Sequence, residues 1–218
     1  MADYKKPDYW QLKARSEGYP ARSVYKLKEI DEKFKLFNAR SGLRVLDIGA
    51  APGSWSLFTL RRFAGKKIGK LETSLLKASF LAAVDLSPLS REFDKGLFDG
   101  ANFFFIQGDV TAAETQSALL EKGPYNLIMS DAAPATTGNN MIDSARSLDI
   151  AEIVLAFAET ENALAAGGNL LIKIFQGSGT DALLKRMRTL FTTAKSFKPQ
   201  ACRGESVETY FVGLGKKT

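Results

Sequence analysis

The sequence of 218 residues predicts an α/β fold in which helices cover both faces of a mostly parallel, doubly wound sheet. Six short runs are almost continuously apolar, which is typical of strands that are buried on both faces. Helical patterns alternate with several of these runs, as in a parallel sheet. The composition, 45% hydrophobic and 25% charged, fits a single domain over residues 1–218.

The predicted strands are near-continuous apolar segments of ordinary strand length. In chain order they are RVLDIG (44–49), FLAAVDL (80–86), ANFFFIQGDV (101–110), YNLIMSD (125–131), NLLIKIF (169–175) and ETYFVGLG (208–215). The fifth contains one charge, Lys173. An ammonium in apolar surroundings is costly unless it is paired or neutralised, so Lys173 is either a rim lysine or a group with a chemical role.

The predicted helices show an apolar stripe or a helix-forming composition. They cover residues 23–37, 111–122, 144–168 and 178–194. The first places four apolar side chains on one face, with Lys26 at the edge of that stripe. Gly167 and Gly168 are expected to end the third helix as a C-cap.

The composition also limits the chemistry. There is no histidine and only one cysteine, Cys202, which excludes an internal disulfide and a cysteine-rich zinc site. If the chain is an enzyme, lysines and carboxylates must move the protons. No run is long enough to span a membrane, and the N-terminus lacks the apolar core of a secretory signal. We therefore expect a cytoplasmic protein without a membrane partner. We also expect a monomer.

The net charge of +6 is unevenly distributed. Residues 1–28 hold seven Lys/Arg against three Asp/Glu, and residues 185–203 hold six Lys/Arg and no acid. One such cluster is ordinarily a solvated face, whereas two beside an acidic remainder favour a polyanionic partner. We expect both segments to flank one RNA-binding face, with residues 1–40 forming a basic N-terminal extension and helix.

In doubly wound folds, ligands bind beyond the carboxyl ends of the strands. The first predicted strand ends in DIGAAPGSW, where Gly49 and Gly53 permit a tight turn before a helix N-terminus. The next three strands end in Asp85, Asp109 and Asp131. An acid after the second strand suits a ribose diol, and Asp109 can accept a hydrogen bond from an adenine amino group.

Each acid also has an ordinary structural explanation. Asp85 can cap the turn into Ser87, and Asp109 can cap a helix starting near Thr111. Three acids at successive strand ends beside a glycine turn nevertheless suggest a ligand with a ribose, an adenine and a positive group. S-adenosylmethionine has all three.

Several motifs together resemble those of the FtsJ-type ribosomal RNA 2′-O-ribose methyltransferases. They are ARSVYKLKEI, VLDIGAAPGSW, VDLSP, QGDV, MSDAAPATTGN, GGNLLIKIFQG and ESVETYFVG. The likeness runs from about residue 15 to the C-terminus in the family's order. It implies a Rossmann-like methyltransferase sheet of seven strands, the last antiparallel. The segment 61–80 is longer than this pattern leads us to expect.

The resemblance also implies the functional residues. Its tetrad of Lys, Asp, Lys and Glu corresponds to Lys26, Asp131, Lys173 and Glu208, with Glu205 as a minor rival for the last position. Its cofactor positions, with S-adenosylmethionine bound and no metal, correspond to Gly53, Trp55, Asp85, Asp109 and Asp131.

The leading functional hypothesis is S-adenosylmethionine-dependent 2′-O-methylation of ribosomal RNA, at a uridine of the large-subunit (23S) RNA. The partner is then ribosomal RNA or the large ribosomal subunit, and Lys173 accepts the hydroxyl proton instead of serving only as an ion-pair partner. The alternatives are a transfer RNA anticodon-loop 2′-O-methyltransferase and a non-catalytic RNA-binding ribosome assembly factor. A nicotinamide-dependent oxidoreductase is disfavoured because the turn lacks the GxGxxG spacing.

Overall fold

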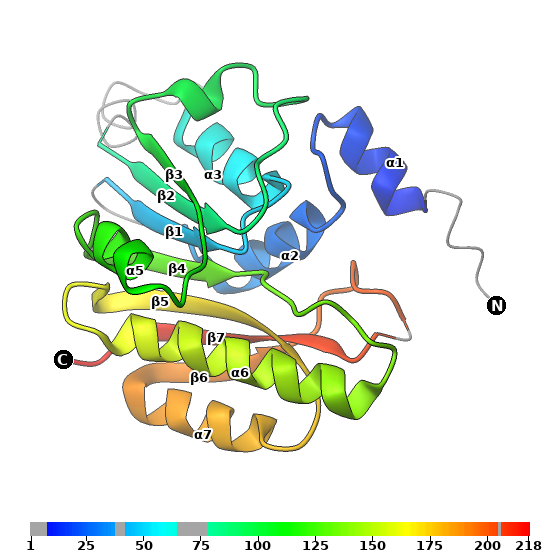
Figure 1. Ribbon diagram of the computed structural model, residues 1–218, viewed down its shortest axis with the longest axis vertical. Helices are drawn as coiled ribbons and strands as arrows, with labels where there is room; N and C mark the ends of the chain where they lie inside the picture. The colour runs from blue at the N-terminus through cyan, green and yellow to red at the C-terminus, as the bar shows by residue number, and fades with distance from the viewer. Residues whose placement is uncertain (1–7, 38–41, 65–77, 205) are drawn as a thin grey trace.

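The centre of the structure, a computed structural model that describes residues 8–37, 42–64, 78–204 and 206–218, is a seven-stranded sheet (Figure 1). The order of its strands is β3-β2-β1-β4-β5-β7-β6. The strands are β1 (Arg44–Ile48), β2 (Phe80–Asp85), β3 (Phe103–Gln107), β4 (Tyr125–Ser130), β5 (Leu164–Phe175), β6 (Phe191–Phe197) and β7 (Glu208–Lys216).

The sheet is mostly parallel, as predicted. The pairs from β3 to β5 are parallel, whereas β7 pairs antiparallel with both β5 and β6. The strand order reverses between β1 and β4, where the chain returns to the middle of the sheet after β3. Such a switch point leaves a crevice at the carboxyl ends of the strands, so the fold itself indicates where to look for a ligand site.

Helices cover both faces of the sheet. They are α1 (Tyr9–Ser16), α2 (Val24–Phe34), α3 (Ser54–Ala64), the short 3₁₀ helix η1 (Leu97–Asp99), α5 (Ala113–Leu120), α6 (Asn140–Glu159) and α7 (Thr180–Leu190). Apolar residues of α2 and α3 pack on one face, and those of α5, α6 and α7 pack on the other. No helix among the described residues has the length and apolar character needed to cross a membrane.

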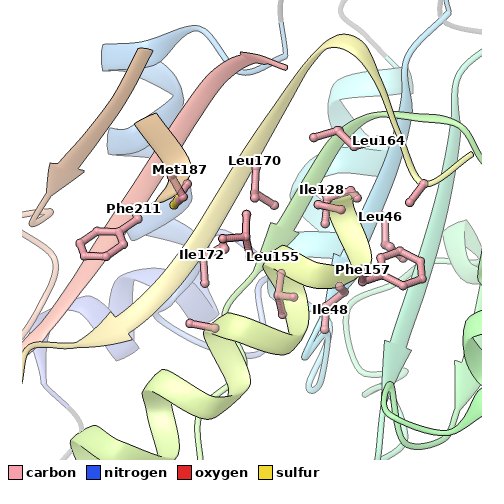
Figure 2. Packing of buried hydrophobic residues seen from close by; sticks show 14 of the residues in the cluster. Leu46, Ile48, Ile128, Leu155, Phe157, Leu164, Leu170, Ile172, Met187 and Phe211 are labelled. Atoms are coloured by element: carbon pink, nitrogen blue, oxygen red, sulfur yellow. The ribbon is translucent and has the colours of Figure 1, made fainter. Parts of the chain in front are cut away.

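Strand β5 shows how alternation assigns side chains to the two layers. Figure 2 shows Leu170 and Ile172 in the layer that contains Leu155 of α6 and Met187 of α7. Because successive strand residues point to opposite faces, Leu171 and Lys173 belong to the other face, under α2 and α3. The alternation therefore directs Lys173 towards the N-terminal helices.

The predicted helix over 144–168 is wrong at both ends. Helix α6 begins at Asn140 and ends at Glu159, and β5 starts at Leu164. Gly167 has φ 74° and lies where the β4–β5 register is interrupted, so that residues 165–168 bulge out of the pairing. The glycine supplies the left-handed conformation that the bulge needs, not a helix C-cap.

The predicted helix over 178–194 is also too long. Helix α7 ends at Leu190, and the next seven residues form β6, which pairs with β7 at the edge of the sheet. Thr192 and Thr193 are β-branched and suit a strand, but the pairing partner comes later in the chain.

Helix α1 was not predicted. Most of the long 61–80 segment, residues 65–77, lies outside the described residues.

Candidate active site

The turn after β1 requires its glycine. Gly49 has φ 76°, and a Cβ atom placed on it would lie 2.6 Å from Cα of Ala132, which follows β4. Only glycine lets these two backbones approach so closely. Gly53 has φ 109° and directly precedes Ser54, the first residue of α3. The sequence motif thus forms the tight strand-to-helix turn that was expected.

A cavity of about 410 Å³ lies at the carboxyl ends of β1, β2, β3 and β4. Its lining includes all three of the predicted strand-end acids, Asp85, Asp109 and Asp131. Ile150 and Ile153 of α6 contribute apolar surface. The cavity therefore combines acceptors for hydroxyl and amino groups with an apolar wall of the kind that suits a flat ring.

Asp85 and Asp109 line this cavity and also hold turns. Asp85 accepts hydrogen bonds from the amide of Ala51 at 2.9 Å and from that of Ser87 at 2.8 Å. Asp109 accepts one from the amide of Thr111 at 2.8 Å, which lowers the pKa of its carboxyl group. The structural and ligand-binding explanations are therefore compatible, because each carboxylate is fixed by the backbone at the edge of the cavity.

Gly53 and Trp55 lie beside the cavity and do not line it. Trp55 is 2% exposed, and its Nε1 donates to the carbonyl of Ser23 at 2.9 Å. Its ring contacts that of Tyr210, with 6.0 Å between the centroids. The indole thus ties α3 to the start of α2, and the cofactor role that the family pattern implies for both residues stays a prediction.

The fold brings the four residues of the expected tetrad together. Ser130 at the end of β4 is paired with Ile172 of β5, which places Asp131 next to Lys173. Nζ of Lys173 lies 3.1 Å from Oδ1 of Asp131 and also donates to the Asp131 carbonyl. Nζ of Lys26, from α2, lies 2.5 Å from Oε1 of Glu208 at the start of β7. Glu205 lies outside the described residues.

Electrostatics favour the charged forms within this cluster. Burial alone would raise the pKa of Asp131, but the ammonium groups of Lys173 and Lys26 outweigh it and hold that pKa below its usual value. Burial alone would lower the pKa of Lys26, but the carboxylates of Asp131 and Glu208 raise it. Asp131 is therefore ionised and Lys26 protonated at neutral pH.

Tyr210 is a member of the cluster that the sequence reasoning missed. Its hydroxyl lies 2.7 Å from Oδ1 of Asp131 and 2.7 Å from Oε1 of Glu208. The signal was present, because Tyr210 follows Glu208 by two positions and so shares its face of β7. Tyr210 is also paired with Lys173 across the β5–β7 ladder. Among the described residues, no group of three or more acids and cysteines is arranged to hold a metal ion.

A second groove, of about 760 Å³, lies between the N-terminal helices and the segment after β6. Its lining includes Trp10, Lys13 and Lys33 from the helices, Phe197 at the end of β6 and Lys198 after it, together with the acids Glu17, Glu29 and Glu32. The two basic segments of the sequence therefore meet here, but only in part. Residues 185–190 belong to α7, which packs on the opposite face of the sheet, so this part of 185–203 does not flank the same face as residues 1–28, contrary to the expectation.

Comparison with known proteins gives consistent matches over nearly the whole chain. The model of the FtsJ-like methyltransferase family matches residues 19–216. Ribosomal RNA large subunit methyltransferase E of Treponema denticola is 44% identical over 214 residues, which cover 98% of this chain and 97% of that protein. The protein of the same name from Oleidesulfovibrio alaskensis is 45% identical over 212 residues, covering 96% and 92%.

Solved structures agree on the fold. A ribosomal RNA methyltransferase from Plasmodium falciparum has a TM-score of 0.70 at 24% identity, over 91% of this chain and 98% of that one. Human methyltransferase-like protein 13, solved in complex with SAH, has a TM-score of 0.50 at 12% identity, over 79% and 72%. The sheet, the glycine turn and the sequence matches lead to one conclusion: the chain belongs to the FtsJ-like methyltransferase family.

Proposed function

We propose that this protein transfers a methyl group from S-adenosylmethionine to a ribose 2′-hydroxyl of large-subunit ribosomal RNA, with uridine as the modified nucleotide. The observation that carries the proposal is the position of Asp131, which lines the strand-end cavity and is also paired with Lys173. Asp131 thus belongs both to the cavity that we propose for the cofactor and to the ion pair with the buried Lys173. The names of the relatives supply the class of RNA.

The cavity has the chemistry that S-adenosylmethionine needs. Asp85, Asp109 and Asp131 line this cavity. We propose that Asp85 accepts hydrogen bonds from the ribose hydroxyls, that Asp109 accepts one from the adenine amino group, and that Asp131 complements the positive end of the molecule. Ile150 and Ile153 suit the adenine ring. When bound, S-adenosylmethionine supplies a methyl group on a positively charged sulfur. Gly53 and Trp55 are proposed to contribute from the start of α3, as the family pattern implies.

We propose that the ammonium of Lys173 first releases a proton to solvent and that the resulting neutral amine then accepts the proton of the 2′-hydroxyl. Lys173 lies on a central strand, and it is 8% exposed. Asp131 holds its Nζ from one side through both a carboxylate and a carbonyl oxygen. Lys26 and Glu208 form the second lysine–carboxylate pair of the cluster. Transfer to a well-oriented hydroxyl depends mainly on such positioning and on removal of one proton.

We further propose that the N-terminal region contributes to RNA binding through the second groove. Ammonium groups lie against aromatic rings there, although three acids also line the groove: Nζ of Lys13 lies 5.4 Å from the Trp10 ring centroid, and Nζ of Lys33 lies 4.1 Å from that of Phe197. Rings that can stack on bases beside lysines that can neutralise phosphates suit a single RNA strand.

We also propose that the protein acts as a cytoplasmic monomer. Light scattering in solution would test the oligomeric state.

The test is transfer of a labelled methyl group by wild type and by Lys173→Ala to large ribosomal subunits that lack the modification, free large-subunit RNA and bulk transfer RNA. We expect 2′-O-methyluridine in ribosomal RNA from the wild type and a loss of about 10²- to 10⁴-fold in the variant. Cofactor affinity should be nearly unchanged by calorimetry. Lys185→Ala, at an exposed lysine of α7, is the matched control and should remain active.

The other outcomes are equally informative. Full activity of Lys173→Ala would refute the role of that lysine. Label only in transfer RNA would preserve the chemistry and change the substrate to an anticodon-loop nucleotide. No label in any acceptor, with cofactor still bound, would favour a non-catalytic RNA-binding assembly factor.

A further inference from the structure

We infer that Tyr210 is a positioning residue that joins the two lysine–carboxylate pairs into a single unit. The inference rests on the proposed function and adds a residue that the tetrad does not contain. Tyr210 is 0% exposed, and its hydroxyl lies 2.7 Å from a carboxylate oxygen of Asp131 and 2.7 Å from one of Glu208. Asp131 in turn holds Lys173, and Glu208 holds Lys26.

The phenol has one proton for two acceptors. Burial, together with the two carboxylates, raises the pKa of Tyr210 well above its ordinary value, so the hydroxyl is protonated at neutral pH. It can therefore donate to only one carboxylate at a time. A carboxylate that accepts this hydrogen bond attracts its lysine less strongly, because part of its charge is already neutralised. The choice of carboxylate to which the phenol donates therefore couples the Asp131–Lys173 ion pair to the Glu208–Lys26 ion pair.

The surroundings of the ring restrict its movement. The ring packs against Trp55 at an interplanar angle of 35°. Trp55 is fixed by its hydrogen bond to the carbonyl of Ser23, immediately before α2, the helix that carries Lys26. On its other side, Tyr210 is paired with Lys173 in the β5–β7 ladder. The phenol oxygen therefore has a defined position between β7, α2 and the end of β4.

Tyr210→Phe tests this role because it removes only the hydroxyl and keeps the ring. We expect kcat to fall by about 10- to 100-fold, the size that corresponds to losing a hydrogen bond to a charged group, with the KM values for RNA and cofactor nearly unchanged. Without the phenol hydroxyl, the pKa of the Asp131 carboxyl rises, so Asp131 loses its charge at a higher pH as the solution is acidified. The acidic limb of the pH profile of kcat should therefore move to higher pH.

Tyr125→Phe is the matched control. Tyr125 is also 0% exposed, and its hydroxyl donates to the carbonyl of Leu119 at 2.7 Å, at the other end of β4 from Asp131. It measures the effect of deleting a buried tyrosine hydroxyl from this fold. We expect reduced thermal stability in both variants, but a displaced pH limb only in Tyr210→Phe.

A second measurement does not depend on methyl transfer. Titration of the Asp131 carboxyl carbon by NMR should give a higher pKa in Tyr210→Phe than in wild type, and an unchanged one in Tyr125→Phe, because the hydrogen bond from Tyr210 contributes to lowering that pKa. An unaltered Asp131 titration, or a kcat that falls equally at every pH, would overturn the inference. A wild type that transfers no methyl group would refute the proposed function alone, since the titration can still support or refute the position of Tyr210.

Discussion

Asp131 has two tasks that place opposite demands on a carboxylate. In the proposed cofactor site Asp131 has to remain charged to complement a positive group, yet it is largely buried, which by itself disfavours the charge. Lys173 at 3.1 Å and the hydroxyl of Tyr210 at 2.7 Å resolve this conflict by stabilising the anion. In addition to the role in proton removal that we propose for Lys173, these contacts therefore keep a carboxylate in the cavity lining charged.

Asp47 presents the same problem without a cation. It lies on β1 and is 0% exposed, and Oδ2 accepts from Oγ of Ser56 at 2.7 Å, whereas Oδ1 has no hydrogen-bond partner among the described residues. Burial raises the pKa of Asp47 from 3.8 to about 7. The folded state therefore binds more protons than the unfolded state between these values, and the free energy of unfolding falls as the pH rises through this window.

We predict that Asp47→Asn removes this pH dependence. The variant should gain stability relative to wild type between pH 5 and pH 8, by up to about 4 kcal/mol if the whole shift is expressed. Urea unfolding at several pH values measures the difference. Asp149→Asn, at an exposed acid of α6, is the control and should follow wild type. A difference in the free energy of unfolding between Asp47→Asn and wild type that is the same at every pH measured would contradict the prediction.

At the scale of elements, the register of β5 places the chemistry. Lys173 faces the N-terminal helices only because it follows Leu171 by two positions along the strand, and Leu171 is buried on that face. A slip of one residue would turn Lys173 to the layer of α6 and α7 and remove it from Asp131. The antiparallel ladder with β7 fixes this register and carries Glu208 and Tyr210 with it.

Helix α1 is held in place by a side chain that follows it. Arg22 pairs with Asp8, the N-cap of α1, and its Nη2 donates to the carbonyl of Ala201 at 2.5 Å. Glu29 of α2 accepts from the amide of Ala201 at 2.9 Å, which secures the same segment. The position of α1, and with it one wall of the second groove, therefore depends on a few polar contacts.

We predict that Arg22→Ala loosens α1 while the sheet stays folded. Amide hydrogen exchange should become faster in residues 9–16 and 199–202, with little change in β1 and β4, and global stability should fall by only about 1 kcal/mol because one partner is at the surface. Arg186→Ala, which removes two ion pairs between α7 and α6, is the control. Unchanged exchange in α1, or equal effects of the two variants on α1, would argue against this tether.

At the scale of the whole molecule, the sheet separates two kinds of basic surface. The groove beside α1 and α2 brings together lysines and aromatic rings on the face that carries the tetrad. On the other face, Arg186 of α7 is paired with Glu152 and Glu159 of α6. The basic residues of the groove and those of α7 therefore lie on opposite faces of the sheet. Only those of the groove share the face that an RNA chain would have to reach to contact Lys173.

We predict that the groove supplies phosphate contacts and that α7 does not. Lys13→Gln combined with Lys33→Gln should weaken RNA binding and reduce the slope of log affinity against log salt concentration by roughly 1.4, or about 0.7 for each lost contact to a single strand. The charge-matched control, Lys185→Gln with Arg188→Gln, should leave the slope unchanged. An equal effect of both pairs would show that binding follows net charge alone.

The sequence by itself determined six of the strands, the glycine turn and the three strand-end acids, and the family motifs in it pointed to the four residues that the fold brings together. Each of these has a local signal: an apolar run, a positive φ that only glycine adopts easily, or a short motif. Tertiary structure decided the remainder. Strand β6 exists because β7 pairs with it, and α6 ends before Gly167 because β5 begins at Leu164. The contacts of Tyr210 arise where β4, β5, β7 and α2 meet, and a pattern read along one chain segment does not contain the distances between segments.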